Sequence, residues 1–318
     1  MLTDQAETQP RHGESYRTDD VDLLSRRYYA APIDYVQVDA GALGAEIHAT
    51  ATSKVEVREA HFHASVLNTV HKRVGRFGLG LGITGHAQFQ GTRCNDSNLA
   101  YSDCRNGVIA RISAGSSWCN LSIDDTLLQE VAAVHGYTIP AGNDGRGMSM
   151  SANAALASKL CRIARSQEGT TLSNEQFDDA MALLVLRSLN PPSTRPRMKP
   201  DKCWTVAHTI IDFIRANYAE PMTLTALCQL VDVSERALRY NFQKATGLSL
   251  QEYLTHYRLH RARALLVNSE VAEVKEAAAA CGIPHAGRFS QYYKAMFRES
   301  PGEVLRRPAP VYRGRRDH

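Results

Sequence analysis

Two stretches about fifty residues apart carry the same helix-turn-helix pattern: Leu224-Thr-Ala-Leu-Cys-Gln-Leu-Val-Asp-Val-Ser-Glu-Arg-Ala-Leu-Arg-Tyr-Asn-Phe242 and Val274-Lys-Glu-Ala-Ala-Ala-Ala-Cys-Gly-Ile-Pro-His-Ala-Gly-Arg-Phe-Ser-Gln-Tyr-Tyr293. In each, a short apolar helix is followed by a turn and by a second helix whose apolar residues recur four positions apart. Such spacing buries one face of the second helix and exposes the other. The duplication predicts an all-helical domain with two helix-turn-helix units.

One amphipathic stretch, Ser249 to Val267, joins the two patterns. Its apolar residues follow a period close to that of an α-helix: Leu250, Tyr253, Leu254, Tyr257, Ala262, Leu265 and Leu266. The pattern predicts one long helix that packs under both units and holds them a fixed distance apart. Major-groove faces of B-DNA recur about 34 Å apart along one side of the duplex. One chain could therefore present its two units to successive grooves.

Length, charge and cysteine content limit the number of domains and the kind of protein that the chain can be. A chain of 318 residues suits about two domains of roughly 150 residues each. The formal net charge is only +4, so affinity for nucleic acid must come from local clusters. The seven cysteines form no Cys-x-x-Cys pair, which is typical of a reducing compartment. Five arginines crowd the C-terminal end, as a tail that is either solvated or in contact with phosphates: Arg306, Arg307, Arg313, Arg315 and Arg316.

The N-terminal half is predicted to be rich in β-strands. Residues 1–28 are polar and charged and indicate a loose arm. Short alternating runs with Gly, Asn, Asp and Ser between them then favour a small antiparallel barrel or sandwich. They are 34–38, 45–48, 54–58, 78–83, 107–112 and 118–122. We therefore expect a β-rich domain over 29–190.

From about residue 123 the residue pattern becomes typical of α-helices. Three helices are expected, at 124–135, 152–167 and 174–189, the last with Ser173 as N-cap and Gln176 in a capping box. Apolar positions on the second and third helices, Leu156, Leu160, Ile163, Ala164, Met181, Leu184 and Leu186, serve either core packing or self-association. Residues 191–200 are a Pro-rich basic segment and therefore an expected linker.

Residues 201–308 resemble the DNA-binding domain of AraC/XylS-type transcription regulators, with 309–318 as the basic tail. The resemblance rests on spaced motifs in order: 234–242, 247–254, 258–266 and 285–294, then Phe297 and Ser300-Pro301. Gly287-Arg-Phe-Ser290 with Tyr293 resembles the branch that includes XylS and the ethanolamine-operon regulator. Three positions depart from the pattern: Asp232 replaces a turn glycine, Ile283 an aromatic residue, and Arg298 a glycine. Asp tolerates the left-handed conformation that the first turn needs.

The resemblance implies that outward residues of the second helix in each unit read base edges. Those residues are Arg236, Arg239, Tyr240, His285, Arg288 and Gln291. Arg can donate two hydrogen bonds to guanine, and Gln can pair with adenine. Ser234, Lys244, Ser290 and Lys294 are the expected phosphate contacts, which fix register without reading sequence. Because Ala286 and Gly287 are small, we expect the first unit to carry more of the specificity.

Two other patterns were weighed as sites. Alternation of His61 and His63, with His71 and His86, permits a metal site of cupin type, but no Glu follows at the usual spacing. Residues 78–82 superficially resemble a phosphate loop but lack the Lys-Ser/Thr and the following helix. A glycine-containing strand is the better interpretation.

The combined prediction is an α+β regulator: a β-rich sensor and dimerisation domain, a linker, and the double helix-turn-helix domain. We expect a sequence-specific activator that is not an enzyme and needs no cofactor or metal. Its expected partners are double-stranded promoter DNA, a small-molecule effector, a second copy of the chain and, by resemblance, RNA polymerase. No apolar run reaches the ~20 residues of a membrane span, so a cytoplasmic, nucleoid-associated protein is expected. The alternatives are a metal-dependent cupin-type enzyme fused to a DNA-binding module and an architectural DNA binder without sequence preference.

Overall fold

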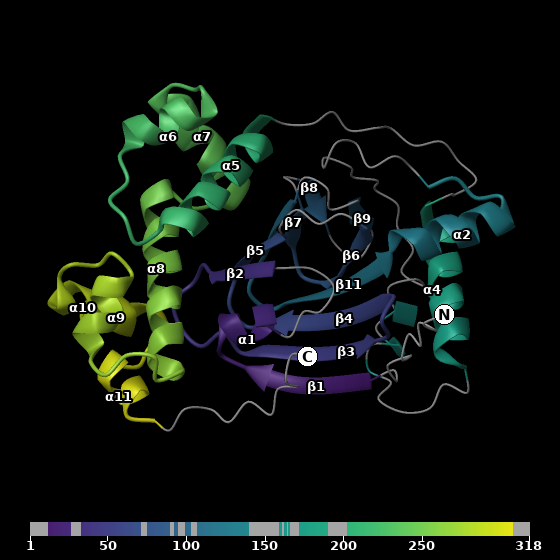
Figure 1. The fold of residues 1–318 in the computed structure, drawn as a ribbon, viewed down its shortest axis with the longest axis horizontal. Coiled ribbons are helices and arrows are strands. Elements are labelled where there is room, and N and C mark those ends of the chain that lie inside the picture. The colour runs from purple at the N-terminus through teal and green to yellow at the C-terminus, as the bar shows by residue number, and fades with distance from the viewer. Residues whose placement is uncertain are drawn as a thin grey trace, which may run out of the picture. The chain divides into compact units, whose positions relative to one another are not determined.

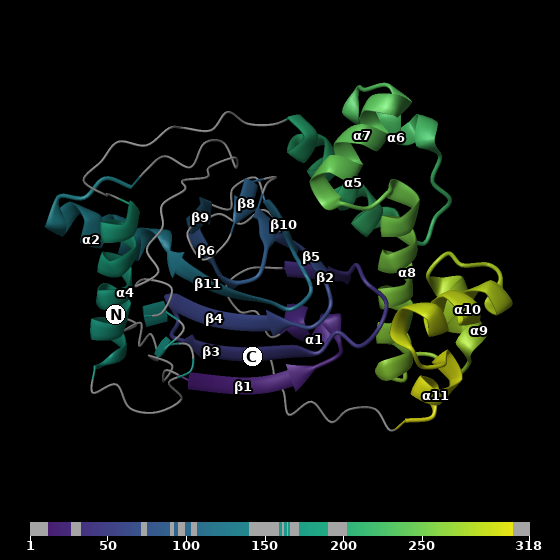
Figure 2. The same ribbon diagram turned by 180° about the vertical axis from the view of Figure 1, so that it is seen from behind.

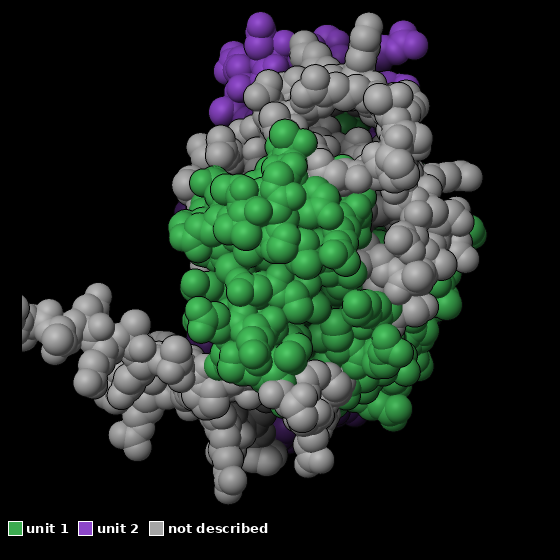
Figure 3. All heavy atoms as spheres, turned by 90° about the vertical axis from the view of Figure 1, so that its right-hand side faces the viewer, with its two compact units in different colours: residues 1–35, 43–204 green, residues 36–42, 205–318 purple. Residues whose placement is uncertain are grey.

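The computed structural model divides the chain into two compact units. Unit 1 comprises residues up to 35 and residues 43–204, and unit 2 comprises residues 36–42 and the chain from residue 205 onward. Figure 3 colours the two units separately. Described in the structure are residues 12–26, 33–70, 75–89, 92–94, 99–102, 107–139, 172–189 and 202–307, with 159, 160, 162, 163 and 165. The expected linker 191–200 and the tail 309–318 lie outside these ranges.

Unit 1 contains two antiparallel sheets (Figure 1). The first has the order β1-β3-β4-β11-β6-β9. Its strands are His12–Thr18, Ala45–Ala51, Val55–Phe62, Ser116–Asp124, Arg76–Thr84 and Leu99–Ser102. The second has the order β2-β5-β10-β7-β8. Its strands are Ile33–Gln37, Val66–Val70, Val108–Ile112, Ala87–Phe89 and Thr92–Cys94.

Alternation along the strands builds two cores on opposite faces of the six-stranded sheet. On β4, Val55 and Val57 enter one core, whereas Ala60 and Phe62 enter the other. The second core includes Tyr35 from β2, whose ring centroid lies 6.1 Å from that of Phe62. The two sheets therefore pack face to face as a sandwich, because successive strand residues point to opposite sides. The strand orders show two open sheets, which do not form the closed barrel that was the other expectation.

Helices α2 (Asp125–His135) and α4 (Asn174–Leu189) cover the face of the six-stranded sheet that carries Val55 and Val57. The core between this face and the helices is called the outer core. Leu160, Met181 and Leu186 are buried there with strand residues such as Leu79. Core packing therefore accounts for these three positions of the expected self-association surface. Leu156 and Ala164 lie outside the residues whose side chains are described.

The predicted strands and glycine-rich run have clear outcomes. All six predicted strands are present, and 78–82 lies within β6 (Arg76–Thr84), so the phosphate-loop alternative is wrong. On β6 Leu79 and Leu81 enter the outer core, and Gly80 lies under the ring of Trp118. A Cβ at Gly80 would lie 2.5 Å from that ring, so close packing explains this glycine.

The loose-arm expectation for residues 1–28 is wrong for its described part. Strand β1 (His12–Thr18) pairs along its full length with β3, and α1 (Val21–Arg26) follows. Leu24 is fully buried in the core between the sheets. Backbone pairing at a sheet edge needs no apolar alternation, so the polar composition of this segment concealed the strand.

Unit 2 is helical apart from the short segment Val36–Ala42. Its helices are α5 (Lys202–Asn217), α6 (Leu224–Val231), α7 (Glu235–Thr246), α8 (Leu250–Val267), α9 (Val274–Ala280), α10 (Ala286–Phe297) and α11 (Pro301–Leu305). Two helix pairs, α6 with α7 and α9 with α10, flank the long α8 (Figures 1 and 2). Among the described residues, no helix combines the length and apolar character that a membrane crossing requires.

Candidate nucleic-acid interface

The first helix pair is fixed by caps at both sides of its turn. The Thr223 hydroxyl accepts a hydrogen bond from the Ala226 N–H, and the Ser234 hydroxyl accepts one from the Ala237 N–H. Between them, Asp232 adopts the left-handed conformation with φ 49° and ends α6. This result agrees with the prediction that Asp tolerates the first turn. The caps set where α7 begins and therefore which of its side chains face outward.

Helix α7 buries one face and exposes the other. Leu238 and Phe242 have no exposed surface, whereas Arg236, Arg239 and Tyr240 are exposed. The Tyr240 side chain is 64% exposed, which is high for a large aromatic group. An exposed aromatic ring on the same helix face as Arg236 and Arg239 can make both apolar and hydrogen-bonding contacts with a polar partner. The three predicted base-reading residues of this unit therefore share one accessible face.

The second helix pair has a tighter turn. Gly282 has φ 69°, and a Cβ placed there would lie 2.4 Å from the backbone oxygen of Ala219. Only glycine fits, because both the conformation and the close backbone approach exclude a side chain. His285, Arg288 and Gln291 are exposed on and just before α10.

Opposite the exposed face of α10, Phe289 and Tyr293 are completely buried. His285 stands at the N-cap but makes no side-chain capping hydrogen bond. The sequence pattern thus located the inward and outward faces of both second helices.

The four predicted phosphate contacts differ in availability. Lys244 and Lys294 are exposed, and the Lys244 ammonium lies 5.9 Å from the Tyr240 ring centroid. Ser234 is exposed, but its hydroxyl oxygen already accepts the capping hydrogen bond. Ser290 is only partly exposed. The two lysines therefore offer exposed positive charge for a phosphate. The Ser234 hydroxyl accepts the capping hydrogen bond but can still donate its own hydrogen to a phosphate oxygen.

The long helix α8 is capped at its start and anchored to a neighbouring segment in its middle. At its start, Ser249 and Glu252 form a reciprocal capping box. Hydrogen bonds from Ser249 lower the pKa of the Glu252 carboxyl group. In its middle, the Arg258 guanidinium donates to the carbonyl oxygens of Tyr218 (2.7 Å) and Glu220 (3.0 Å) after α5. These bonds fix α8 against the corner between α5 and α6, so α8 can act as a rigid spacer.

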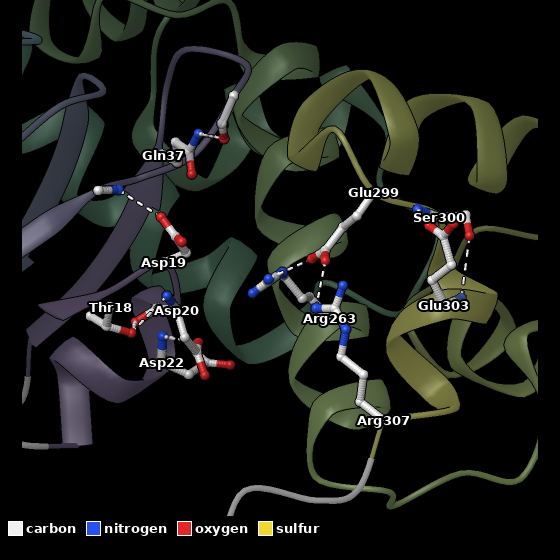
Figure 4. A network of polar contacts seen from close by, with 12 residues as sticks. Thr18, Asp19, Asp20, Asp22, Gln37, Arg263, Glu299, Ser300, Glu303 and Arg307 are labelled. Atoms are coloured by element: carbon white, nitrogen blue, oxygen red, sulfur yellow. Dashed lines mark hydrogen bonds and ion pairs between the residues drawn. The ribbon is translucent and has the colours of Figure 1, made fainter.

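A charged network secures the end of α10 (Figure 4). Glu299 accepts from Arg263 on α8 at 2.5 Å and from Arg307 at 2.7 Å. Arg298 takes the left-handed conformation, with φ 59°, and its N–H donates to the Lys294 carbonyl oxygen. The departure from glycine at this position therefore leaves the C-terminal cap of α10 intact.

Within unit 2, the segment Val36–Ala42 contacts α8 and α10. The Gln37 N–H donates to Nε2 of His260 at 3.1 Å, and the Gly41 N–H donates to the Met296 carbonyl oxygen at 2.8 Å. Burial lowers the pKa of His260 to about 3, and the nearby His256 and Arg263 act in the same direction. Residue spacing could not predict this contact, because its partners are more than two hundred residues apart.

The histidines that offered an alternative metal site show no metal-binding geometry in the described part of the chain. The His61 and His63 rings lie edge to face at 5.1 Å, and His61 Nδ1 is 2.9 Å from the Ser117 hydroxyl. No group of three or more His, Cys, Asp or Glu side chains that could hold a metal ion occurs among the residues described. His71 lies outside them.

Comparison with known proteins identifies the helical part. Residues 227–307 match a family model described as a helix-turn-helix domain. The XylDLEGF operon transcriptional activator 2 of Pseudomonas putida is 28% identical over 138 residues, 42% of this chain and 86% of that protein. The chain is a transcriptional regulator of the AraC/XylS type. This assignment favours a DNA-binding regulator over the cupin-type enzyme.

Several other similarities cover about a third of the chain. The probable thc operon regulatory protein of Rhodococcus erythropolis is 33% identical over 103 residues, 32% of this chain and 31% of that protein. A solved structure of a probable AraC family transcriptional regulator from Rhodopseudomonas palustris CGA009 is 32% identical, with a TM-score of 0.32. The match covers 33% of this chain and 99% of that one. Apart from the 86% match, the chain spans about a third of the length of the first relatives that it matches.

Proposed function

We propose that this AraC/XylS-type regulator activates transcription by binding a specific double-stranded DNA site through α7 and α10 together. The supporting observation is that two similar helix pairs, each with an exposed face on its second helix, flank one anchored helix. Helix α8 has 18 residues and is therefore about 27 Å long at 1.5 Å per residue. Adding the width of the flanking pairs allows a separation near the ~34 Å turn of B-DNA.

Base reading is proposed for the six outward residues and phosphate contact for the four others. Arg236, Arg239 and Tyr240 would read one groove, and His285, Arg288 and Gln291 the next. Lys244 and Lys294 would supply charge for the phosphates, with Ser234 and Ser290 as hydroxyl donors. Arg and Gln are suited to bidentate hydrogen bonds with guanine and adenine, respectively.

The remaining parts of the proposal concern unit 1 and the partners. The β-sandwich with its helices would bind a small-molecule effector and join two copies of the chain. Residues 191–200 would form the linker and 201–308 an autonomous DNA-binding domain. RNA polymerase is the proposed partner at the promoter, and the proposed location is the cytoplasm, on the nucleoid. The two units' separate cores support a two-domain division.

Selection of binding sites from random duplexes by the purified full chain tests the proposal. Two blocks of preferred base pairs, about one helical turn apart, are expected. Uniform binding to all duplexes with a steep salt dependence would instead identify an architectural binder. Failure to bind any duplex at low salt would reject DNA binding altogether.

A further inference from the structure

The first residue of α7, Glu235, forms an ion pair with a proposed base-reading residue. Its Oε1 accepts from Arg239 Nη2 at 2.8 Å and from Arg239 Nε at 3.0 Å. The two side chains are 59% and 61% exposed, so both lie on the accessible face of α7. Their spacing of four residues places them one turn apart on the same side of the helix. The pair is therefore part of the surface proposed to face DNA.

The hydrogen bonds leave one edge of the guanidinium group open. Arginine carries five N–H donors, one on Nε and two on each terminal nitrogen. Glu235 engages the Nε side, so the end edge, with one donor on each terminal nitrogen, remains directed away from the carboxylate. That edge can donate two parallel hydrogen bonds to O6 and N7 of guanine. The ion pair with Glu235 thus leaves Arg239 with this edge available to a base.

The charge of Glu235 also has a consequence for binding. A carboxylate on a surface that approaches DNA is repelled by the phosphates, so it lowers affinity for every sequence. It also neutralises Arg239, which otherwise would be drawn to the nearest phosphate. At the same place after the N-cap, α10 has Ala286 and no carboxylate. The pairing is therefore a property of the first helix-turn-helix unit and not of the repeated pattern.

We infer that Glu235 is a specificity-determining residue that directs Arg239 to a guanine and away from the phosphate backbone. The inference rests on the proposed base-reading role of α7. Glu235 raises the ratio of specific to non-specific affinity while it lowers non-specific affinity itself. A glutamate that served only the helix would also repel phosphates, but it would leave the ratio of specific to non-specific affinity unchanged, since an acidic group at a helix N-terminus stabilises the helix whatever DNA is present.

The test compares full-length wild type with Glu235→Gln on a selected duplex and on one in which the guanine assigned to Arg239 is replaced. Glu235→Gln should bind the replaced duplex several-fold more tightly than wild type does, and the ratio between the two duplexes should fall roughly tenfold. The dependence of log affinity on log salt should steepen by about one unit, because Arg239 becomes free to contact a phosphate.

Two further variants separate positioning from general charge. Glu175→Gln removes an exposed acidic group from the first turn of α4 in unit 1, so it should leave the ratio unchanged. In an Arg239→Gln background, Glu235→Gln should no longer change the ratio, since the two residues act as one. Thermal unfolding of each variant identifies any loss of folding, and the salt slope and ratio are insensitive to a small stability change.

Each outcome bears on one claim. If wild type shows no base preference, the proposed function fails before Glu235 is considered. If wild type selects a site and Glu235→Gln keeps the same ratio and salt slope, the inference is wrong. An equal effect of Glu235→Gln with and without Arg239 would also overturn it, because the carboxylate would then act on DNA alone.

Discussion

The two helix-turn-helix units share a pattern but are stabilised differently. In the first, hydroxyl groups of Thr223 and Ser234 cap both helices, and Asp232 supplies the turn. In the second, His285 gives no side-chain cap, and the turn depends on Gly282 packed against the Ala219 backbone. The first unit is therefore fixed mainly by local hydrogen bonds. In the second, Glu276 accepts a local capping hydrogen bond from the Glu273 N–H, but the turn depends on contact with a distant part of unit 2.

This difference extends to the exposed faces. The first turns of α7 carry charged side chains, including the Glu235–Arg239 pair. The first turn of α10 begins with Ala286 and Gly287, and no Cβ contact explains the glycine. A charged face suits discrimination between bases, whereas small residues suit close approach of the backbone.

The largest expected effect comes from exchanging the turn residues. Gly282→Ala should lower the free energy of unfolding by about 3 kcal/mol, because it combines a positive φ with a clash against the Ala219 carbonyl oxygen. Asp232→Gly should change stability by less than about 1 kcal/mol, since glycine adopts the same conformation easily. Urea unfolding of the full-length variants measures both. Equal losses would show that the two turns are held alike.

Removing an arginine from each of α7 and α10 should affect separate base pairs if both helices read DNA as proposed. Arg239→Ala and Arg288→Ala should each cost about 1–3 kcal/mol of binding free energy and relax base preference at one location, with the two locations about one helical turn apart. Site selection with wild type and both variants is the measurement. As a control, Lys244→Ala should weaken all sites about equally and reduce the salt slope by about one unit. The two-groove proposal would not survive if both arginine variants altered the same base pairs.

Lowering the pH should decrease the folding stability of unit 2 through His260. Its imidazole contacts the Phe297 ring at 5.1 Å and is buried, with a pKa of about 3 against 6.5 for an exposed group. Between pH 3 and pH 6.5 His260 is protonated in the unfolded chain but neutral in the folded protein. Protons therefore favour the unfolded chain, so stability is complete above pH 6.5 and falls as the pH is lowered. At pH 5 the loss is about 2 kcal/mol, from 1.36 kcal/mol per pH unit.

Burial also lowers the pKa of His256, which adds to the loss in the same direction. Urea unfolding at pH 7 and pH 5 measures the change in stability. His260→Gln retains an acceptor for the Gln37 N–H but cannot titrate, so much of the pH dependence should disappear. His285→Gln, at an exposed position, should keep the full dependence. An unchanged pH dependence in His260→Gln would exclude this histidine as its cause.

The sequence predicted what depends on local periodicity. Apolar spacing located α7, α8 and α10, and the faces that bury Phe242 and Tyr293. It also located six strands of unit 1. Strand β5 was missed because its interior positions include Asn68 and Thr69, which are buried polar residues and break the apolar alternation. Buried polar side chains need partners from other strands, and sequence spacing does not reveal those partners.

Contacts between distant segments could not be predicted from spacing. Nothing near Gln37 indicates that its N–H meets His260. Likewise, Gly282 is recognisable as a turn residue, but its closeness to Ala219 joins segments that lie far apart in the sequence. By contrast, the Glu235–Arg239 pair was accessible from sequence, since glutamate four residues before arginine on a helix is a favourable pairing.

The smallest expected effect in stability is also the sharpest test of the second unit. Gly287 lies in the first turn of α10 without a positive φ, and a Cβ there would meet nothing within 4 Å. Folding therefore does not require glycine, which costs roughly 0.5–1 kcal/mol relative to alanine inside a helix. Gly287→Ala should stabilise the protein by up to that amount. If α10 approaches DNA closely at this point, the same methyl group should reduce affinity several-fold, because close backbone approach is a role that only glycine fills.

Gly302 provides a matched control for the expected gain in folding stability and loss of DNA affinity. It lies in α11, and a Cβ there also meets nothing within 4 Å, so Gly302→Ala should stabilise the fold without weakening DNA binding. Urea unfolding and affinity for the selected duplex are measured on both variants. Opposite changes in stability and affinity for Gly287→Ala alone would establish close approach in the second groove. If its affinity stays at the wild-type value, α10 binds through side chains as α7 does, and the contrast between the two units would be limited to how each one is stabilised.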